Sequence, residues 1–142
     1  MAGEGEGRQT LGKHERIASQ KLIDMLFTGG QSHSLAAFPL RAVFLLRKGE
    51  AFAQQPAGKV QILISVPKRR LRHAVDRNRV KRQLREAFRK HKLLLAGSVA
   101  EGCSLAVAFI WLSDRLLPSA AVESRVENLL NGISGRLSSM GD

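Results

Sequence analysis

Twelve lysine and arginine side chains lie between Lys68 and Lys92, where only Asp76 and Glu86 oppose them. Twelve positive against two negative charges give this segment +10, out of a formal net charge of +11 for all 142 residues. Clustered ammonium and guanidinium groups bind phosphates, and arginine can do so with two parallel hydrogen bonds. A basic segment embedded in a nearly neutral chain predicts a built surface for a polyanion: RNA, DNA or an anionic membrane.

The spacing within this segment predicts an amphipathic helix from about Ala74 to Lys92. One stripe is apolar and should pack on a core; it holds Val80, Leu84, Ala87 and Phe88. A second stripe is cationic; it holds Arg77, Lys81, Arg85 and Arg89, with Asn78 and Arg82 beside it. Like charges four residues apart destabilise a helix, and a phosphate-bearing partner would remove that cost. The alternatives are a solvated basic face and, for Asn78, a simple turn residue instead of a contact to a base edge or sugar.

The sequence lacks the patterns of protein-only catalysis. Its four histidines are scattered without metal-ligand spacing, and the lone Cys103 excludes an internal disulfide framework or a Cys-rich zinc site. No Ser-His-Asp, paired-carboxylate or Gly-rich phosphate-loop pattern occurs. His73 and Asp76 fit surface positions, or contacts to a hydrated metal on an RNA. We therefore expect no metal held by the protein alone.

The apolar runs and the N-terminus bear on location. No run approaches the roughly 18 apolar residues of a membrane span, and the start MAGEGEGRQ lacks a signal-peptide pattern. These features predict a cytoplasmic chain without a membrane partner.

The elements that must position the basic helix follow from periodicity. We expect a disordered tail over 1–10 and one domain over 11–142. A first helix is predicted over Glu15–Thr28 and a last helix after Pro118. Apolar runs predict strands over Phe38–Leu46, Val60–Val66 and Ser104–Trp111, the first two pairing as an antiparallel hairpin. The order α-β-β-α-β-α indicates an α+β sandwich with a small sheet.

The stretch from Ile64 to Arg89, ISVPKRRLRHAVDRNRVKRQLREAFR, resembles the signature of the bacterial ribonuclease P protein subunit. Three blocks carry the resemblance: Ser65, Val66, Lys68 and Arg69; then Ala74, Val75, Arg77, Asn78, Arg79, Val80, Lys81 and Arg82; then Arg85, Glu86 and Phe88. Outside these blocks, the family's opening helix and first long strand fit Arg16, Ile17, Phe27, Gly30 and Phe38. The resemblance extends from about Leu11 to Leu137.

The resemblance implies a fold and a function. The fold would be a single α+β domain with a small mixed sheet and a left-handed β-α-β crossover. The protein would be one monomer per RNA in ribonuclease P, where a catalytic RNA with bound Mg²⁺ removes the 5′ leader of precursor tRNA and the protein alone is inactive. The residues that would bind the RNA subunit are Lys68, Arg69, Arg77, Asn78, Arg79, Lys81, Arg82, Arg85 and Arg89. Those of a cleft for the single-stranded leader would be Ile23, Phe27, Phe38 and Arg41.

The sequence departs from the family's pattern in the expected cleft. Leu22-Ile23 stands where many members have Asp-Phe, and Arg41 stands where many have Tyr. The cleft would then rely more on Arg41 and less on stacking, with Trp111 a further aromatic at the end of the last strand. Phe27 is equally consistent with plain core packing. Two other functions stay open: a non-catalytic ribosomal or RNA-assembly protein, and a DNA-binding protein that uses residues 77–92 as a recognition helix.

Overall fold

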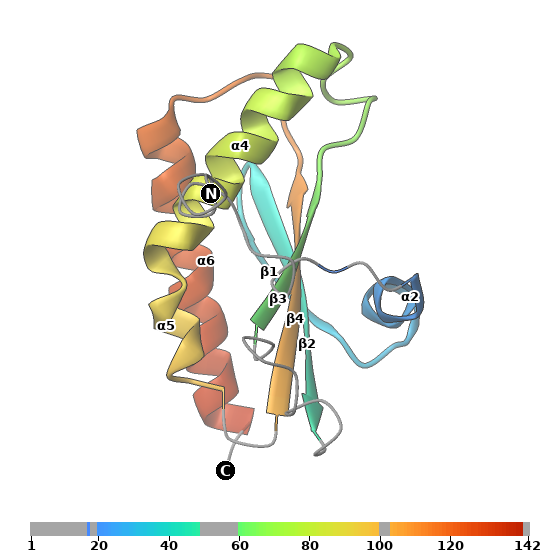
Figure 1. Cartoon of the computed structure of the whole chain (residues 1–142), viewed down its shortest axis with the longest axis vertical. Coiled ribbons are helices and arrows are strands. Elements are labelled where there is room, and N and C mark those ends of the chain that lie inside the picture. The colour runs from blue at the N-terminus through green and yellow to red at the C-terminus, as the bar shows by residue number, and fades with distance from the viewer. Residues whose placement is uncertain (1–16, 18–19, 49–59, 100–102, 141–142) are drawn as a thin grey trace, which may run out of the picture.

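A computed structural model describes residues 17, 20–48, 60–99 and 103–140, so the predicted tail over 1–10 lies outside the described residues. The elements in chain order are α2 (Gln20–Thr28), β1 (His33–Ala37), β2 (Leu40–Lys48), β3 (Val60–Ser65), α4 (Ala74–His91), α5 (Leu93–Ala96), β4 (Cys103–Trp111) and α6 (Ser119–Met140). Helices α4, α5 and α6 cover one face of the sheet, and α2 lies against the other (Figure 1).

The sheet has the strand order β1-β2-β4-β3. Strand β2 is antiparallel to both β1 and β4, whereas β3 is parallel to β4. The predicted hairpin between residues 38–46 and 60–66 is therefore wrong, because β4 lies between these two strands. The physical reason is burial: β4 is apolar except for Ser104 and is buried on both faces, as suits a central strand. The parallel pair β3 and β4 is joined through α4 and α5, which makes a β-α-β unit.

Strand β1 is an element that the periodicity did not predict. Its sequence, HSLAA, contains only one large apolar residue, so its strand propensity is weak. It is held by its pairing with β2, from His33 opposite Phe44 to Ala37 opposite Leu40. Strand β2 consequently begins at Leu40, and the predicted strand start at Phe38 belongs to the β1–β2 turn.

The larger part of the core lies between the sheet and helices α4 to α6. The predicted apolar stripe of α4 is buried there in full, and Phe88 packs edge-on against Phe109 of β4 with ring centroids 6.3 Å apart. The predicted last helix, α6, buries one apolar stripe in the same core, formed by Val122, Val126, Leu129, Leu130, Ile133 and Leu137. The helix is entered from Pro118, whose carbonyl accepts the backbone N–H groups of Ala121 and Val122. Full burial of a side chain such as Phe88 contributes about 2–3 kcal/mol, so α4 is firmly anchored.

The smaller part of the core lies under α2. Leu22 and Leu26 of this helix pack on small residues of β4, Ala106 and Ala108, and on aliphatic side chains of β2. Helix α2 has only nine residues and leaves the outer part of this sheet face accessible, where Arg41 is exposed. One face of the sheet is thus sealed, and the other is half open.

Candidate nucleic-acid interface

The connection between β3 and α4 presents the first cations of the basic segment. After β3, the carbonyl of Pro67 accepts the backbone N–H groups of Arg70 and Leu71 at 3.0 and 3.2 Å, which closes a tight turn. Leu71 is buried and fixes the turn on the core. Lys68 and Arg69 therefore project from a defined turn at the end of a core strand, and both are exposed.

Arg77 holds this connection to the first turn of α4. Its Nη1 donates to the carbonyls of Leu71 and Arg72 at 2.9 and 2.8 Å. The helix itself starts when the His73 carbonyl accepts the N–H groups of Asp76 and Arg77. The Nη1 group of Arg77 therefore fixes the backbone of the connection, and the residue as a whole is half-buried.

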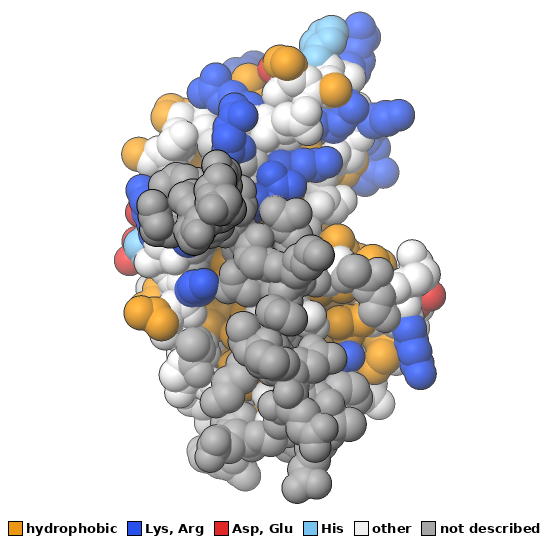
Figure 2. Space-filling view, viewed as in Figure 1, with side chains coloured by type: hydrophobic (Ala, Val, Ile, Leu, Met, Phe, Trp, Pro, Cys, Tyr) orange, Lys and Arg blue, Asp and Glu red, His pale blue; other side chains and the backbone are white. Residues whose placement is uncertain are grey.

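Most of the remaining cations of the segment divide into two groups, and Arg70, whose Nη1 lies 3.5 Å from Asp114, belongs to neither. Six of them have no ion pair or side-chain hydrogen bond among the residues that the structure describes, and all but the half-buried Lys81 are exposed: Lys68, Arg69, Arg72, Arg79, Lys81 and Arg82. They lie on the β3–α4 connection and the first half of α4. Figure 2 shows Lys and Arg side chains gathered at this end of the molecule. Asn78 is exposed on the same turns of the helix.

Arg89, Lys90 and His91, at the end of α4, have acidic partners instead. Arg89 binds Glu86 through two hydrogen bonds of 3.1 and 2.5 Å, which lowers the pKa of the Glu86 carboxyl. Glu123 of α6 accepts a 2.7 Å hydrogen bond from His91, and Lys90 lies 3.7 Å away. The bond from His91, with the nearby charge of Lys90, lowers the pKa of Glu123. The cationic stripe predicted from spacing is therefore not uniform. In the first half of α4 its cations, Arg77 and Lys81, have no acidic partner among the described residues, whereas the end of the helix is largely neutralised. Arg85 is half-buried and also has a partner.

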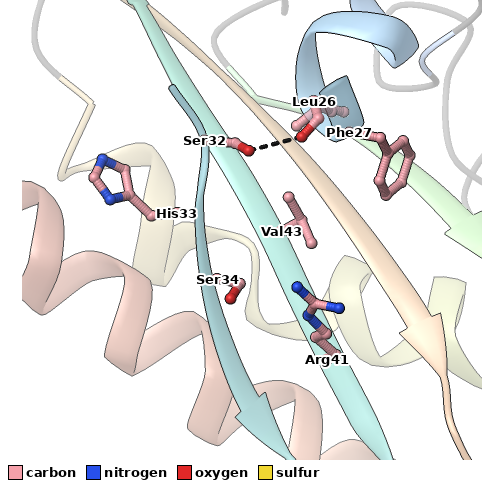
Figure 3. Close-up of a pocket in the computed structure, with 7 residues that line it drawn as sticks. All are labelled: Leu26, Phe27, Ser32, His33, Ser34, Arg41 and Val43. Atoms are coloured by element: carbon pink, nitrogen blue, oxygen red, sulfur yellow. Dashed lines mark hydrogen bonds between the residues drawn. The ribbon is translucent and has the colours of Figure 1, made fainter. Parts of the chain in front are cut away.

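A pocket of about 250 Å³ opens beside α2 on the half-open sheet face. It is lined by Leu26, Phe27, Ser32, His33, Ser34, Arg41 and Val43. Figure 3 shows Phe27 at the end of α2 and Arg41 on β2, with Val43 between them. Phe27 is 45% exposed, so its ring is not consumed by core packing. An aromatic face and a free-standing guanidinium on one pocket can hold a base and a phosphate of single-stranded nucleic acid.

The end of α2 is built to place Phe27 over the strands. The helix stops at Gly29 and Gly30, and Gly30 has a φ of +79°, a backbone conformation that side chains disfavour. Ser32 then donates from its Oγ to the Leu26 carbonyl at 2.7 Å, which folds the connection back onto the helix (Figure 3). The pocket is also lined by three residues of this connection and of β1, namely Ser32, His33 and Ser34. The sequence analysis did not place them in a site, because it did not predict β1.

The other two predicted cleft residues lie elsewhere. Ile23 is half-buried on α2 and packs on the smaller core cluster without lining the pocket. Phe38 is 69% exposed in the β1–β2 turn and lines a different depression, formed with Arg70 and the residues after β4. Trp111 is fully buried and contributes to the larger core. The structure therefore brings Phe27 and Arg41 together and separates Phe38 from them.

The side chains that commonly bind metal ions are dispersed over the described part of the chain. Within residues 17, 20–48, 60–99 and 103–140, no three His, Cys, Asp or Glu side chains gather closely enough to hold an ion. His73 is exposed at the start of α4, and Asp76 lies half-buried on its first turn. The residues of these ranges therefore do not form a metal cage. No helix among the described residues is long and apolar enough to span a membrane.

Comparison with known proteins identifies the family. The family model described as Ribonuclease P matches residues 11–132. The ribonuclease P protein component of Porphyromonas gingivalis is 36% identical over 130 residues, which is 91% of this chain and 90% of that protein. The component of Chlorobium phaeobacteroides is 37% identical over 93 residues, covering 66% of this chain and 61% of that one.

Solved structures show the same fold. The Staphylococcus aureus ribonuclease P protein superposes with a TM-score of 0.61 at 20% identity, over 84% of this chain and 94% of that one. The Thermotoga maritima protein gives a TM-score of 0.57 at 20% identity, over 83% and 96%. The predicted α+β sandwich with a mixed sheet is thereby confirmed. Together with the sequence relatives, these matches show that the chain belongs to the ribonuclease P protein family, and that it is a protein subunit of the endoribonuclease that matures the 5′ end of tRNA.

Proposed function

We propose that the chain binds the catalytic RNA of ribonuclease P through the free cations of the β3–α4 connection and the first half of α4. The observation that carries this proposal is the division of the basic segment. Cations held only for folding would find acidic partners, as Arg89 does with Glu86. Apart from Arg70, those of the connection and the first half of α4 have no such partner among the described residues, and most of them are exposed. RNA phosphates supply the missing negative charge.

The predicted contacts then take distinct roles. Lys68, Arg69, Arg79 and Arg82 meet phosphates directly, with Lys81 at the edge of the same surface. Asn78 lies among them and bonds to a base edge or a sugar. Arg77 binds phosphate through Nη2 and Nε while Nη1 fixes the connection. Arg85 and Arg89 are members of the predicted set that already have partners, so they contribute less to RNA binding than the cations without one.

The pocket of Phe27 and Arg41 is proposed to hold the single-stranded 5′ leader of precursor tRNA. A base stacks on Phe27, and a leader phosphate pairs with Arg41. Ile23 supports this wall of the pocket from the core side of α2. Because the pocket lies on the opposite sheet face from α5 and α6, the protein can hold the leader while α4 stays bound to the RNA subunit (Figures 1 and 3).

Bond cleavage is assigned to the RNA subunit. Hydrolysis of the phosphodiester bond that joins the leader to the tRNA is metal-ion chemistry supplied by Mg²⁺ on that RNA, and the residues that the structure describes offer no cage for the ion. The protein contributes binding, positioning of the leader and neutralisation of phosphates where RNA strands converge. We expect one protein monomer per RNA, in the cytoplasm, where precursor tRNA is made.

Reconstitution tests the proposal. The full chain is mixed with a bacterial ribonuclease P RNA and precursor tRNA at low Mg²⁺, and leader removal is followed by gel electrophoresis. We expect cleavage to be faster by about tenfold or more than with RNA alone, because phosphate repulsion limits the RNA at low Mg²⁺. The chain without RNA should not cleave. No acceleration over RNA alone would overturn the proposal.

A further inference from the structure

A second depression lies where the β1–β2 turn, the β3–α4 connection and the residues after β4 meet. Its volume is about 430 Å³, within the range of roughly 300–1,000 Å³ typical of small-ligand sites. It is lined by Phe38, Arg70, Leu112, Ser113, Asp114 and Arg115. It shares no residue with the pocket of Phe27 and Arg41. The proposed leader contacts therefore do not explain it.

The aromatic ring of this depression is held in place by its backbone. The Phe38 carbonyl accepts a 2.9 Å hydrogen bond from Arg125 Nε of α6, and the Pro39 carbonyl accepts the Leu112 N–H at 2.7 Å. These bonds tie the β1–β2 turn to two other elements, yet the Phe38 side chain remains 69% exposed. A large apolar ring on a fixed backbone, left in water, is suited to stacking on a planar ligand.

The charged groups of the depression are also ordered by local structure. The Ser113 hydroxyl accepts the backbone N–H of Arg115 at 3.0 Å, a side-chain turn that fixes the positions of Asp114 and Arg115 after β4. Asp114 is 3.5 Å from Arg70 Nη1, a long ion pair, and its side chain is 70% exposed. Arg70 Nε is buried and has no hydrogen-bond partner among the described residues. Both groups retain unused hydrogen-bonding capacity.

We propose that this depression binds one unpaired guanine nucleotide of an RNA. The base stacks on Phe38, the Asp114 carboxylate accepts hydrogen bonds from the base edge, and the guanidinium groups of Arg70 and Arg115 take the phosphate. The inference rests on the proposed function for the presence of an RNA. It adds a base-selective site at the end of the molecule away from α5.

Guanine is selected by the chemistry of the carboxylate. An ionised carboxylate is an acceptor only, with two oxygens side by side. The Watson–Crick edge of guanine presents two adjacent donors, N1–H and the N2 amino group. Adenine and cytosine each place an acceptor nitrogen next to their amino donor, and uracil has a single N–H between two carbonyls. Asp114 therefore pairs fully with guanine and meets a lone pair on any other base.

Binding of short RNAs by the full chain tests this site without the RNA subunit. Fluorescein-labelled UUGUU, UUAUU, UUCUU, UUUUU and UUIUU, where I is inosine, are titrated by fluorescence anisotropy. We expect UUGUU to bind about fivefold more tightly than the others, from one bidentate contact. Inosine, which lacks the amino group, should lose most of that preference. Equal affinities for all five RNAs would overturn the inference.

Substitutions locate the preference. Asp114→Asn should flatten it to less than about twofold, whereas Glu127→Gln, which removes an exposed carboxylate on α6 outside the depression, should leave it intact. Phe38→Ala should weaken all five RNAs by about tenfold, and Phe38→Leu, which keeps apolar area but no aromatic face, should do nearly the same. A guanine preference that survives Asp114→Asn would also overturn the inference.

Two further arms separate this inference from the proposed function. In Phe27→Ala/Arg41→Ala, the leader pocket is removed, and the guanine preference should persist; its loss would show that the preference belongs to that pocket. In the holoenzyme, 6-thioguanosine is placed either in the precursor leader or in the RNA subunit and cross-linked. An adduct to the peptide containing Phe38 from one arm identifies the source of the nucleotide. No adduct from either arm would contradict the site.

Discussion

The two faces of the sheet are built from different kinds of residues. The face under α4, α5 and α6 is filled by large side chains, with Phe44, Phe88, Phe109 and Trp111 all fully buried. The face under α2 is floored by Ala106 and Ala108 and is covered by nine helical residues. Its margin exposes Arg41 in place of a core residue.

This difference shows how one small domain serves two binding tasks. On the sealed face, α4 is fixed by burial of its whole apolar stripe, so its outer cations are held in a constant arrangement. On the half-open face, small residues let α2 approach the sheet closely, while an aromatic and a cation stay accessible beside it. The tight packing of α4 holds the basic surface in place, and the incomplete covering of the sheet by α2 leaves room for the pocket.

The largest test of the comparison is to remove one aromatic ring from each face. Phe88→Ala should lower the free energy of unfolding by about 3–5 kcal/mol, because it leaves a cavity in the sealed core. Phe27→Ala should lower it by less than about 1 kcal/mol, because the Phe27 ring is already half in water. Urea denaturation monitored by circular dichroism measures both. If Phe88→Ala does not fold, Phe88→Leu gives a graded version with a loss of about 1 kcal/mol. Equal losses on the two faces would break the comparison.

The second test separates binding from folding on α4. Arg79→Ala/Arg82→Ala should weaken affinity for the RNA subunit by about tenfold and reduce the salt slope by about two, since each lost phosphate contact removes about one. The free energy of unfolding should change by less than about 0.5 kcal/mol, because both side chains are exposed and unpartnered among the described residues. Filter binding over a range of salt concentrations measures the slope.

Two single variants serve as controls for that test. Arg136→Ala removes an exposed cation from α6 and should leave the salt slope unchanged. Arg77→Ala should lower both RNA affinity and stability, the latter by about 1–3 kcal/mol, because two carbonyl groups lose a charged donor. If Arg77→Ala left stability unchanged, the role of Arg77 in fixing the β3–α4 connection would be refuted.

The third test concerns the half-open face. Arg41→Ala should weaken binding of leader-bearing precursor tRNA to the holoenzyme by about three- to tenfold and leave mature tRNA unaffected, since only the precursor reaches the pocket. Lys21→Ala is the matched control, because it removes an exposed cation of α2 that does not line the pocket. Equal effects of Arg41→Ala on both tRNAs would remove Arg41 from the leader site.

The sequence predicted best those features that depend on local spacing. The apolar stripe of α4 and its bounds, Ala74 to His91 against the predicted Ala74 to Lys92, follow from helical periodicity and needed no partner. The pairing of strands did not follow, because β2 and β3 are both flanked by β4, which lies some 40 residues further along the chain than β3. Sequence order favours hairpins, and only the burial of β4 on both faces shows that it is central.

The candidate site divides in the same way. The family motif contains the cations near the start of α4. Helical spacing alone could have paired Arg89 with Glu86, three residues earlier. It could not show that Glu123 meets Lys90 and His91, since Glu123 is brought there by the packing of α6 on α4. Likewise, Phe27 and Arg41 meet only because α2 packs across β2. Phe38 resembled a cleft residue in sequence, yet the β1–β2 turn directs it to another depression.

The smallest effect that we expect is a change in how stability depends on pH when the ion pairs at the end of α4 are removed. The hydrogen bond from His91 and the charge of Lys90 lower the pKa of Glu123 below its ordinary value of 4.5. A carboxyl with a lowered pKa stabilises the fold above its unfolded pKa, and that contribution is lost as the pH falls through the lowered value. Stability should therefore fall more steeply between about pH 5 and 3 in the parent chain than in Glu123→Gln. The effect is small because water and salt screen an exposed ion pair.

Thermal unfolding of both proteins across that pH range measures the difference. Glu127→Gln is the control, since Glu127 is exposed on the same helix and has no ion pair among the described residues. Glu86→Gln should behave like Glu123→Gln, because Arg89 lowers the pKa of Glu86 in the same direction. Glu123→Gln, unlike Glu86→Gln, removes a link between two helices of the sealed face, so its effect at neutral pH should exceed that of Glu86→Gln. A larger loss of stability in Glu86→Gln than in Glu123→Gln would mean that α4 is held on α6 by apolar packing alone. The two glutamates would then serve only to neutralise the positive charge at the end of α4, which the RNA does not contact.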